Sequence, residues 1–227
     1  MKTSWRDRWL DSGGWATIPN RGFSAQAKDG KGEILIYEQI GLSWWDGSGI
    51  SAKQFAESLK ALGDVTTIDI RINSPGGDVS EADAIYSQLL QCNAKTNVFI
   101  DGLAASCASY IAMAGDTIAI AEHGKIMIHN AWGIVLGNAA ELRKAADVLG
   151  VFDTAIRTIY VKRTGQSDSQ IKNLMAEETW FVGQEAADNG FADSVILAKE
   201  KPASDLLRKP KDFDYLRRKF DLSVRIA

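Results

Sequence analysis

Short apolar runs alternate with helical patterns through the middle of this chain. Runs of about four to eight residues rich in β-branched and aromatic side chains predict strands. Apolar residues that recur at every third or fourth position predict amphipathic helices. The predicted strands are Glu33–Glu38, Val65–Ile72, Asn97–Asp101, Thr117–Ile120 and Lys125–His129.

The predicted helices fall between and after these runs. Several open on the spacing of a capping box, in which a polar residue and the residue three positions later bond each other's backbone. These pairs are Ser51 with Gln54, Asn138 with Glu141 and Ser167 with Gln170. The helices cover residues 52–62, 79–90, about 104–114 and 138–163, followed by a short helix after Ser167. This alternation predicts an α/β fold with parallel strand–helix repeats.

The chain divides into three parts. Residues 1–31 are rich in Gly, Ser, Arg and Asp and are predicted to form a flexible N-terminal arm. Residues 32–198 hold the alternating pattern and are predicted to form the folded domain. Residues 199–227 carry dense mixed charge and are predicted to form a C-terminal tail.

Composition narrows the class of protein. With 227 residues, 45% of them apolar, the chain is long enough to bury a full core. A net charge of −3 with interspersed signs gives no basic stripe for nucleic acid. We find neither a signal-peptide core nor the roughly 20 apolar residues that span a bilayer. Cys92 and Cys107 have no metal or disulfide spacing, so we expect reduced thiols in a cytoplasmic protein.

Three segments carry residues of a serine hydrolase site. Arg71–Asp78 contains a Pro-Gly-Gly turn, Gly102–Cys107 places a serine among small residues, and Met127–His129 ends a strand on a histidine. Such a site needs an oxyanion-binding turn, a nucleophile and a general base. The other histidine, His123, lies in a Glu-His-Gly sequence typical of a turn.

Ser106 is the candidate nucleophile. It is predicted to lie in the first turn of a helix, where free N–H groups favour negative charge. A structural role as a helix cap or a close helix contact is equally compatible with this pattern, and Ser109 is a rival one turn later. The N–H groups of Gly77 and Cys107 are the predicted oxyanion donors, although Pro-Gly-Gly also forms turns for backbone reasons alone.

The order of these motifs resembles the ClpP-like serine proteases. The matching segments are Ser74–Gly77, Gly102–Ser106, Ile126–His129 and Thr164–Gln166. Within that family, the chain is similar to the bacteriophage or prophage branch associated with prohead maturation. That similarity rests on Trp44–Asp46, Gly47–Ile50, Ala52–Lys53 and Glu178–Trp180. The tryptophans at 44, 45 and 180 are interpreted as core or subunit-contact residues rather than a ligand cage.

The resemblance implies a ClpP/crotonase-type fold and assigns roles to residues. It selects Ser106 as the nucleophile and His129 as the general base. An ungapped comparison places Glu178 where the family has an aspartate that orients the histidine, with Glu177 adjacent. It also implies a homo-oligomer, most simply a ring, through the long helix 138–163. The predicted core face of that helix carries Leu142, Ala145, Ala146, Leu149, Phe152, Ile156, Ile159 and Tyr160. Apolar residues lie off this face at Val148, Val151 and Val161.

The chain is therefore predicted to be a serine endopeptidase that needs no metal or other cofactor. By resemblance, its substrates are phage scaffold or capsid proteins, cleaved in the host cytoplasm or inside an immature head. Two alternatives remain: a crotonase-type acyl-CoA enzyme on the same fold, and a non-catalytic assembly subunit that forms rings. The chain shows no nucleotide-binding loop, so any ATP dependence must come from a partner.

Overall fold

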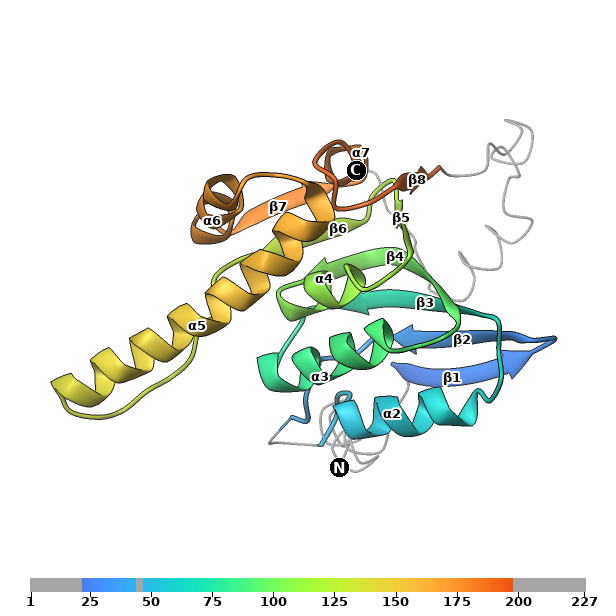
Figure 1. Ribbon diagram of the computed structural model, residues 1–227, viewed down its shortest axis with the longest axis horizontal. Helices are drawn as coiled ribbons and strands as arrows, with labels where there is room; N and C mark the ends of the chain where they lie inside the picture. Colours follow the sequence, from blue (N-terminus) through green and yellow to red (C-terminus); the bar gives the residue numbers. More distant parts are fainter. Residues whose placement is uncertain (1–21, 44–46, 198–227) are drawn as a thin grey trace, which may run out of the picture. The chain divides into compact units, whose positions relative to one another are not determined.

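The computed structural model describes residues 22–43 and 47–197. Its centre is one mostly parallel sheet with strand order β1-β2-β3-β4-β5-β8, to which β6 is added beside β4 and β7 beside β6 (Figure 1). The β1–β2 and β6–β7 pairs are antiparallel. The strands are β1 Phe23–Lys28, β2 Lys31–Ile36, β3 Thr67–Ser74, β4 Lys95–Ala105, β5 Thr117–Ala121, β6 Lys125–Ile128, β7 Thr179–Val182 and β8 Ser194–Ile196.

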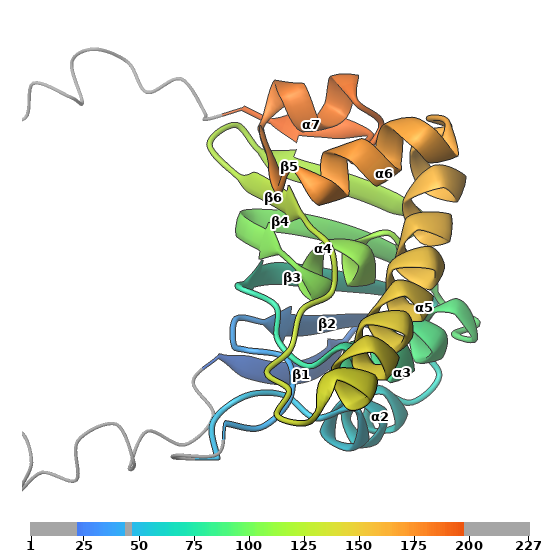
Figure 2. The ribbon, with the colours of Figure 1, turned by 90° about the vertical axis from the view of Figure 1, so that its left-hand side faces the viewer.

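Helices cover one face of this sheet, as the side view shows (Figure 2). All three predicted capping boxes are formed, at Ser51, Asn138 and Ser167. The helices are α2 Ala52–Ala61, α3 Val79–Leu90, α4 Cys107–Ala112, α5 Ala139–Thr164, α6 Asp168–Ala176 and α7 Gln184–Asp188. The predicted α/β fold with parallel strand–helix repeats is confirmed.

The core lies between the sheet and these helices. Alternate strand residues point into it, because successive side chains of a strand face opposite sides of the sheet. They are almost all isoleucines, with no more than 1% of their surface exposed: Ile34, Ile36, Ile68, Ile70, Ile72, Ile100, Ile118 and Ile120. On the opposite face, Arg71 pairs with Asp101 and lies over the ring of Phe99.

The strand that leads to Ser106 is longer than predicted. β4 continues through Ala105, so the helix begins at Cys107 and not near Ala104. The extension is held by pairing of Leu103–Ala105 with Lys125–Met127 of β6. The two paired segments are far apart in the sequence, so the sequence of this stretch alone does not indicate the pairing. Its small residues were therefore interpreted as the start of a helix.

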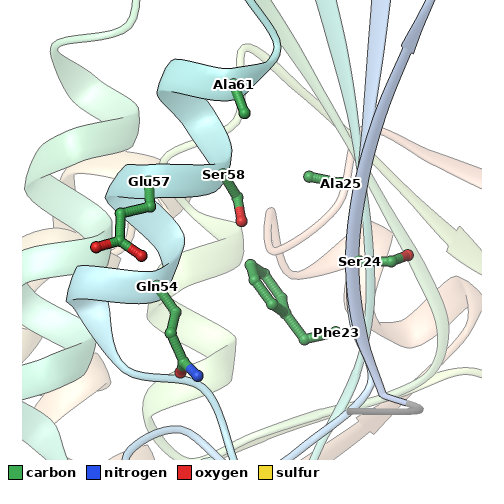
Figure 3. A pocket seen from close by; sticks show the side chains of 7 residues that line it. All are labelled: Phe23, Ser24, Ala25, Gln54, Glu57, Ser58 and Ala61. Carbon is green, nitrogen blue, oxygen red and sulfur yellow. The ribbon is translucent and has the colours of Figure 1, made fainter. Parts of the chain in front are cut away.

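Part of the predicted N-terminal arm belongs to the sheet. Residues 23–28 form β1, and the Phe23 ring packs against Phe55 of α2 with 6.4 Å between centroids. A hollow of about 370 Å³ lies between β1 and α2 (Figure 3). None of the predicted site residues lines it. Residues 1–21, 44–46 and the predicted tail 199–227 lie outside the described residues.

In the part of the chain that the structure describes, the buried side chains of the long helix α5 lie in its C-terminal half. Ile156 and Tyr160 are buried, and Arg163 pairs with Asp193 at 2.6 Å. The N-terminal half extends away from the sheet (Figure 1), and Leu142 on the predicted core face is exposed. The prediction of a continuous core face was therefore wrong for this half, because no described residue covers it. No helix in the described ranges is long and apolar enough to cross a bilayer.

Candidate active site

Ser106 occupies the junction between β4 and α4. Its backbone has φ 53° and ψ −131°, which a residue with a Cβ seldom adopts. Its N–H donates to the Met127 carbonyl at 3.0 Å, so neighbouring strand β6 holds the junction in place. Although Ser106 is the N-cap of α4, its side chain makes no capping hydrogen bond. The hydroxyl is thus free for another partner.

That partner is His129. Its Nε2 lies 2.7 Å from the Ser106 Oγ, and both residues are half-buried. The contact follows from the sheet: β4 and β6 run parallel, Ala105 is in register with Met127, and both side chains follow the ends of their strands. With a neutral imidazole protonated on Nδ1, Nε2 can accept the Ser106 proton.

Ser109, the rival serine, has no access to solvent. Its side chain is fully buried, and its hydroxyl donates to the Ser106 carbonyl at 2.5 Å. The same hydroxyl lies 2.6 Å from the Tyr160 hydroxyl. A substrate carbonyl cannot reach an atom in this position, so of the two serines only Ser106 is placed for attack.

The Pro-Gly-Gly turn lies against Ser106. A Cβ built on Gly76, which has φ 90°, would be 2.7 Å from the Ser106 Cβ and 3.1 Å from the Cys107 nitrogen. Ser74 ties the turn down, because its hydroxyl donates to the Glu38 carbonyl at 2.6 Å and accepts from the Gly76 N–H. The positive φ and the close approach of the two backbones both require glycine at this position.

The two predicted oxyanion donors lie at this contact. Among the described residues, neither the Gly77 N–H nor the Cys107 N–H donates to an oxygen atom. Burial raises the pKa of the Cys107 thiol to about 12, and a contact with the Gly77 N–H offsets only part of this rise. The thiol is thus protonated at neutral pH, and sulfur is a weak acceptor that an oxyanion can replace.

The backbone of Glu178 lies beside the backbone of His129, but the Glu178 carboxylate is directed to another partner. The last paired residues of β6 and β7 are Ile128 and Thr179, so Glu178 is the next residue in register with His129. Its carboxylate is exposed and accepts from the Trp180 Nε1 at 3.4 Å. In the described residues, His129 forms no ion pair.

The backbone of Glu178 is unusual for its residue type. It follows the C-terminus of α6 with φ 51°, a position where glycine or asparagine is favoured. Glu177, the alternative carboxylate, is the C-cap of α6 and is also exposed. Strained residues are concentrated at functional sites. The role of Glu178 therefore stays a prediction, with a backbone observation in its favour.

Other predicted features lie away from this constellation. His123 is exposed in a turn, where its carbonyl accepts from the Lys125 Nζ. Trp180 is partly exposed on β7, whereas Trp44 and Trp45 are outside the described residues. Within the described ranges, no group of three or more His, Cys, Asp and Glu side chains is arranged to hold a metal ion.

Sequence reasoning missed the hydroxyl of Tyr160. Tyr160 was predicted as one more apolar position on the face of the long helix. In the structure its ring packs edge-on against Phe191, and its hydroxyl reaches Ser109. A tyrosine at a core position of a helix was the available signal, because a buried phenol needs a hydrogen-bond partner.

Comparisons with known proteins agree with this architecture. Among solved structures, a mutant of ClpP1 from Listeria monocytogenes has a TM-score of 0.62 and 24% sequence identity. The alignment covers 72% of this chain and 90% of that one, and at this identity it shows the fold.

Sequence comparison finds related proteolytic subunits. The chain is 32% identical over 132 residues to the ATP-dependent Clp protease proteolytic subunit 2 of Mycolicibacterium paratuberculosis. That alignment covers 57% of this chain and 66% of the relative, just under two thirds of its length. The corresponding subunit 2 of Corynebacterium glutamicum is 32% identical over 141 residues, with 61% and 70% covered.

The family model described as Clp protease matches residues 49–199. This range contains the glycine turn, Ser106, His129 and Glu178, and it makes up more than half of the 227 residues. The chain belongs to the Clp protease family.

Proposed function

We propose that this protein is a serine endopeptidase that cleaves peptide bonds through an acyl-enzyme. The observation that carries the proposal is the 2.7 Å contact between the Ser106 Oγ and the His129 Nε2. A serine whose backbone is strained, whose side chain does not cap its helix, and whose hydroxyl meets an imidazole has the arrangement of an activated nucleophile.

In the proposed mechanism, Ser106 attacks the peptide carbonyl while His129 takes its proton. The oxyanion that forms accepts hydrogen bonds from the Gly77 and Cys107 N–H groups. His129 then gives the proton to the leaving amine, and a water molecule releases the acyl group by the same steps in reverse. Glu178 orients the imidazole after its carboxylate turns from Trp180 toward the Nδ1 of His129, whose backbone is next in register.

A crotonase-type acyl-CoA enzyme is the alternative that shares the fold. Such an enzyme needs oxyanion donors but no serine–histidine pair. The Ser106–His129 contact and the match to the Clp protease model both favour a peptidase. A non-catalytic ring subunit is the other alternative, and the position of the Glu178 carboxylate on Trp180 favours it.

The finer proposal concerns substrates. The segments Trp44–Asp46 and Glu178–Trp180 are similar to the phage prohead branch of the family, so we propose phage scaffold or capsid proteins as substrates. Cleavage would then take place in the host cytoplasm, inside an immature head. The curated relatives are named as proteolytic subunits of ATP-dependent Clp proteases. The alternative to phage substrates is therefore that a separate ATP-dependent unfoldase delivers other proteins to this subunit.

We also propose that the protein acts as a homo-oligomer, most simply a ring. The loop before α5 exposes Trp132, Ile134 and Leu136, the last with 93% of its surface accessible. Val148 and Val151 are exposed on the projecting half of α5. Several large apolar side chains left exposed on two consecutive segments are typical of protein–protein contacts.

Labelling with a fluorophosphonate tests the peptidase proposal directly. This probe reacts with an activated serine, so we expect one adduct on the native protein, located at Ser106 by mass spectrometry. The Ser106→Ala variant and the heat-unfolded protein are the controls, and neither should be labelled. An intact native protein that does not react would contradict the proposal and support the non-catalytic alternative.

A further inference from the structure

A chain of two buried hydroxyls runs from α5 to the carbonyl of Ser106. Ser109 donates to that carbonyl at 2.5 Å and meets the Tyr160 hydroxyl at 2.6 Å. Ser109 is fully buried, and Tyr160 is 1% exposed. Alanine and phenylalanine would fill nearly the same space without bringing polar atoms into the core, where they are costly unless hydrogen-bonded. Packing alone therefore does not account for the two hydroxyls.

The direction of this chain is fixed by its protons. A carbonyl oxygen only accepts, so Ser109 gives its single proton to the Ser106 carbonyl. Tyr160 must then be the donor to Ser109. Burial raises the pKa of Tyr160, which keeps the phenol protonated and able to donate across the pH range in which proteins are stable.

The carbonyl at the end of the chain shares its peptide group with the Cys107 N–H. No peptide bond among the described residues is cis, so the carbonyl and the N–H of this group point in opposite directions. The carbonyl points into the core toward Ser109. The N–H therefore points outward, toward Gly76, where a built Cβ would lie 3.1 Å from the Cys107 nitrogen.

We infer that Tyr160 and Ser109 are positioning residues that fix the direction and increase the donor strength of the Cys107 N–H. The inference rests on the proposed peptidase function, in which this N–H stabilises the oxyanion. A hydrogen bond accepted by the carbonyl polarises the peptide group, and such cooperative strengthening is about 10–30% per bond. The same bond holds Ser106 in its unusual backbone conformation, with φ 53°.

The Tyr160→Phe variant tests the inference, because it deletes only the first donor of the chain. The measurement is the inactivation of the protein by a fluorophosphonate, with the limiting rate and the half-saturating concentration determined separately. Loss of a whole oxyanion donor costs about 100- to 1000-fold in rate, so weakening the donor by about 10–30% should slow the limiting rate about two- to eightfold. The half-saturating concentration should not change, since it reports binding before any oxyanion forms.

Tyr110→Phe is the matched control. Tyr110 lies on the same helix as Ser109, is equally buried, and donates to the Val79 carbonyl at 3.1 Å. Tyr110→Phe loses this bond and also the interaction of the hydroxyl with the Asp83 carboxylate, so it should lower the melting temperature at least as much as Tyr160→Phe. Only Tyr160→Phe should react more slowly, which separates donor positioning from general stability.

The Ser109→Ala variant gives a second, independent readout. It should slow the limiting rate at least as much as Tyr160→Phe, and the double variant should be no slower than Ser109→Ala alone. This non-additivity follows because Tyr160 acts only through Ser109. If Tyr160→Phe does not fold, Ser109→Ala carries the same test.

The outcomes separate the two proposals. A parent protein that is not labelled at Ser106 would overturn the peptidase function and this inference with it. A parent that is labelled, together with a folded Tyr160→Phe variant that reacts at the parent's rate, would overturn the inference alone. Equal slowing in Tyr110→Phe and Tyr160→Phe would also overturn it, because the effect would then be one of stability.

Discussion

The Ser106 hydroxyl bonds His129 instead of the N–H groups of the helix that Ser106 begins. A serine at an N-cap ordinarily accepts a hydrogen bond from its own helix, which stabilises the protein by about 1 kcal/mol. Here the Ser106 side chain is turned toward His129 and makes no capping bond. The backbone of Ser106 is also strained, with φ 53°. The position thus combines poor local stability with an arrangement suited to catalysis.

Replacing Ser106 separates these two properties. Ser106→Ala and His129→Ala should each lower kcat on an unfolded protein substrate by about three orders of magnitude or more. The double variant should be no worse than either single one, since the two side chains act as a unit. Ser106→Gly should be equally inactive yet more stable by about 1 kcal/mol, because glycine adopts this backbone without strain. Calorimetry checks the stability, and unchanged turnover in Ser106→Ala would contradict the assignment.

Glu178 and Glu177 form a natural pair of test and control. Glu178→Gln should lower kcat by orders of magnitude, because an amide orients a charged imidazole poorly. Glu177→Gln should have a mild effect, since Glu177 is an exposed C-cap. Reversed effects would show that the residue carried over from the family is off by one position. If neither change matters, the site works as a Ser–His dyad.

Local sequence signals predicted most of the elements that hold the site. The capping boxes at Ser51, Asn138 and Ser167 are formed because each depends only on residues within one turn. The bounds of α3, Val79–Leu90, were predicted as they are observed. Short elements such as β7 and α7 were missed, because four or five residues are too few to show a periodic pattern.

Non-local pairing is what the sequence did not reveal. Addition of β6 beside the end of β4 extends that strand to Ala105 and brings His129 to Ser106. No residue pattern in either strand specifies this partner. The positive φ of Ser106 was equally hidden, because the residue expected at such a backbone is glycine. Exposure of the first half of α5 depends on what surrounds the helix and not on its periodicity.

The Gly76 turn should tolerate no side chain. In Gly76→Ala, the new Cβ would lie 2.6 Å from the Ala105 carbonyl oxygen and 2.7 Å from the Ser106 Cβ, at φ 90°. We expect a loss of stability of at least about 2 kcal/mol and loss of fluorophosphonate labelling.

Gly150→Ala is the control, because a Cβ there meets nothing within 4 Å. It lies inside helix α5 and should stabilise the protein by about 0.5–1 kcal/mol. Denaturant unfolding of both variants checks these signs.

The Cys107 thiol should be dispensable for activity but visible in alkaline unfolding. In the folded protein, burial raises the pKa of this thiol to about 12. In the unfolded chain the thiol ionises near pH 8.5, about its unperturbed value. The folded state therefore holds a proton that the unfolded state has lost, and the stability present below about pH 8.5 is lost as the pH rises toward 12.

The Cys107→Ala variant should keep its activity, because the proposed donor is the backbone N–H. Its unfolding free energy should fall less steeply than that of the parent between about pH 8.5 and 12. Urea unfolding at several pH values measures the difference, and subtraction removes the tyrosines common to both proteins. Identical slopes would show that the thiol reaches solvent in the folded state. A loss of activity would show that the sulfur itself takes part.

The projecting half of α5 should be the site of self-association. Val148 and Val151 are exposed there, and Ile134 on the preceding loop has 89% of its surface accessible. Obligate interfaces are large and apolar, so introduced charges in their centre are strongly unfavourable. Val148→Lys and Val151→Lys together should convert an oligomer to smaller species, measured by light scattering at micromolar concentration. Ala155→Lys, an exposed position on the half of α5 that packs on the domain, is the control and should leave the assembly intact.

A truncated chain of residues 1–198 should also remain oligomeric. Loss of the oligomer on truncation would place the contact in the tail, and a monomeric parent would rule out ring formation as an intrinsic property of the chain.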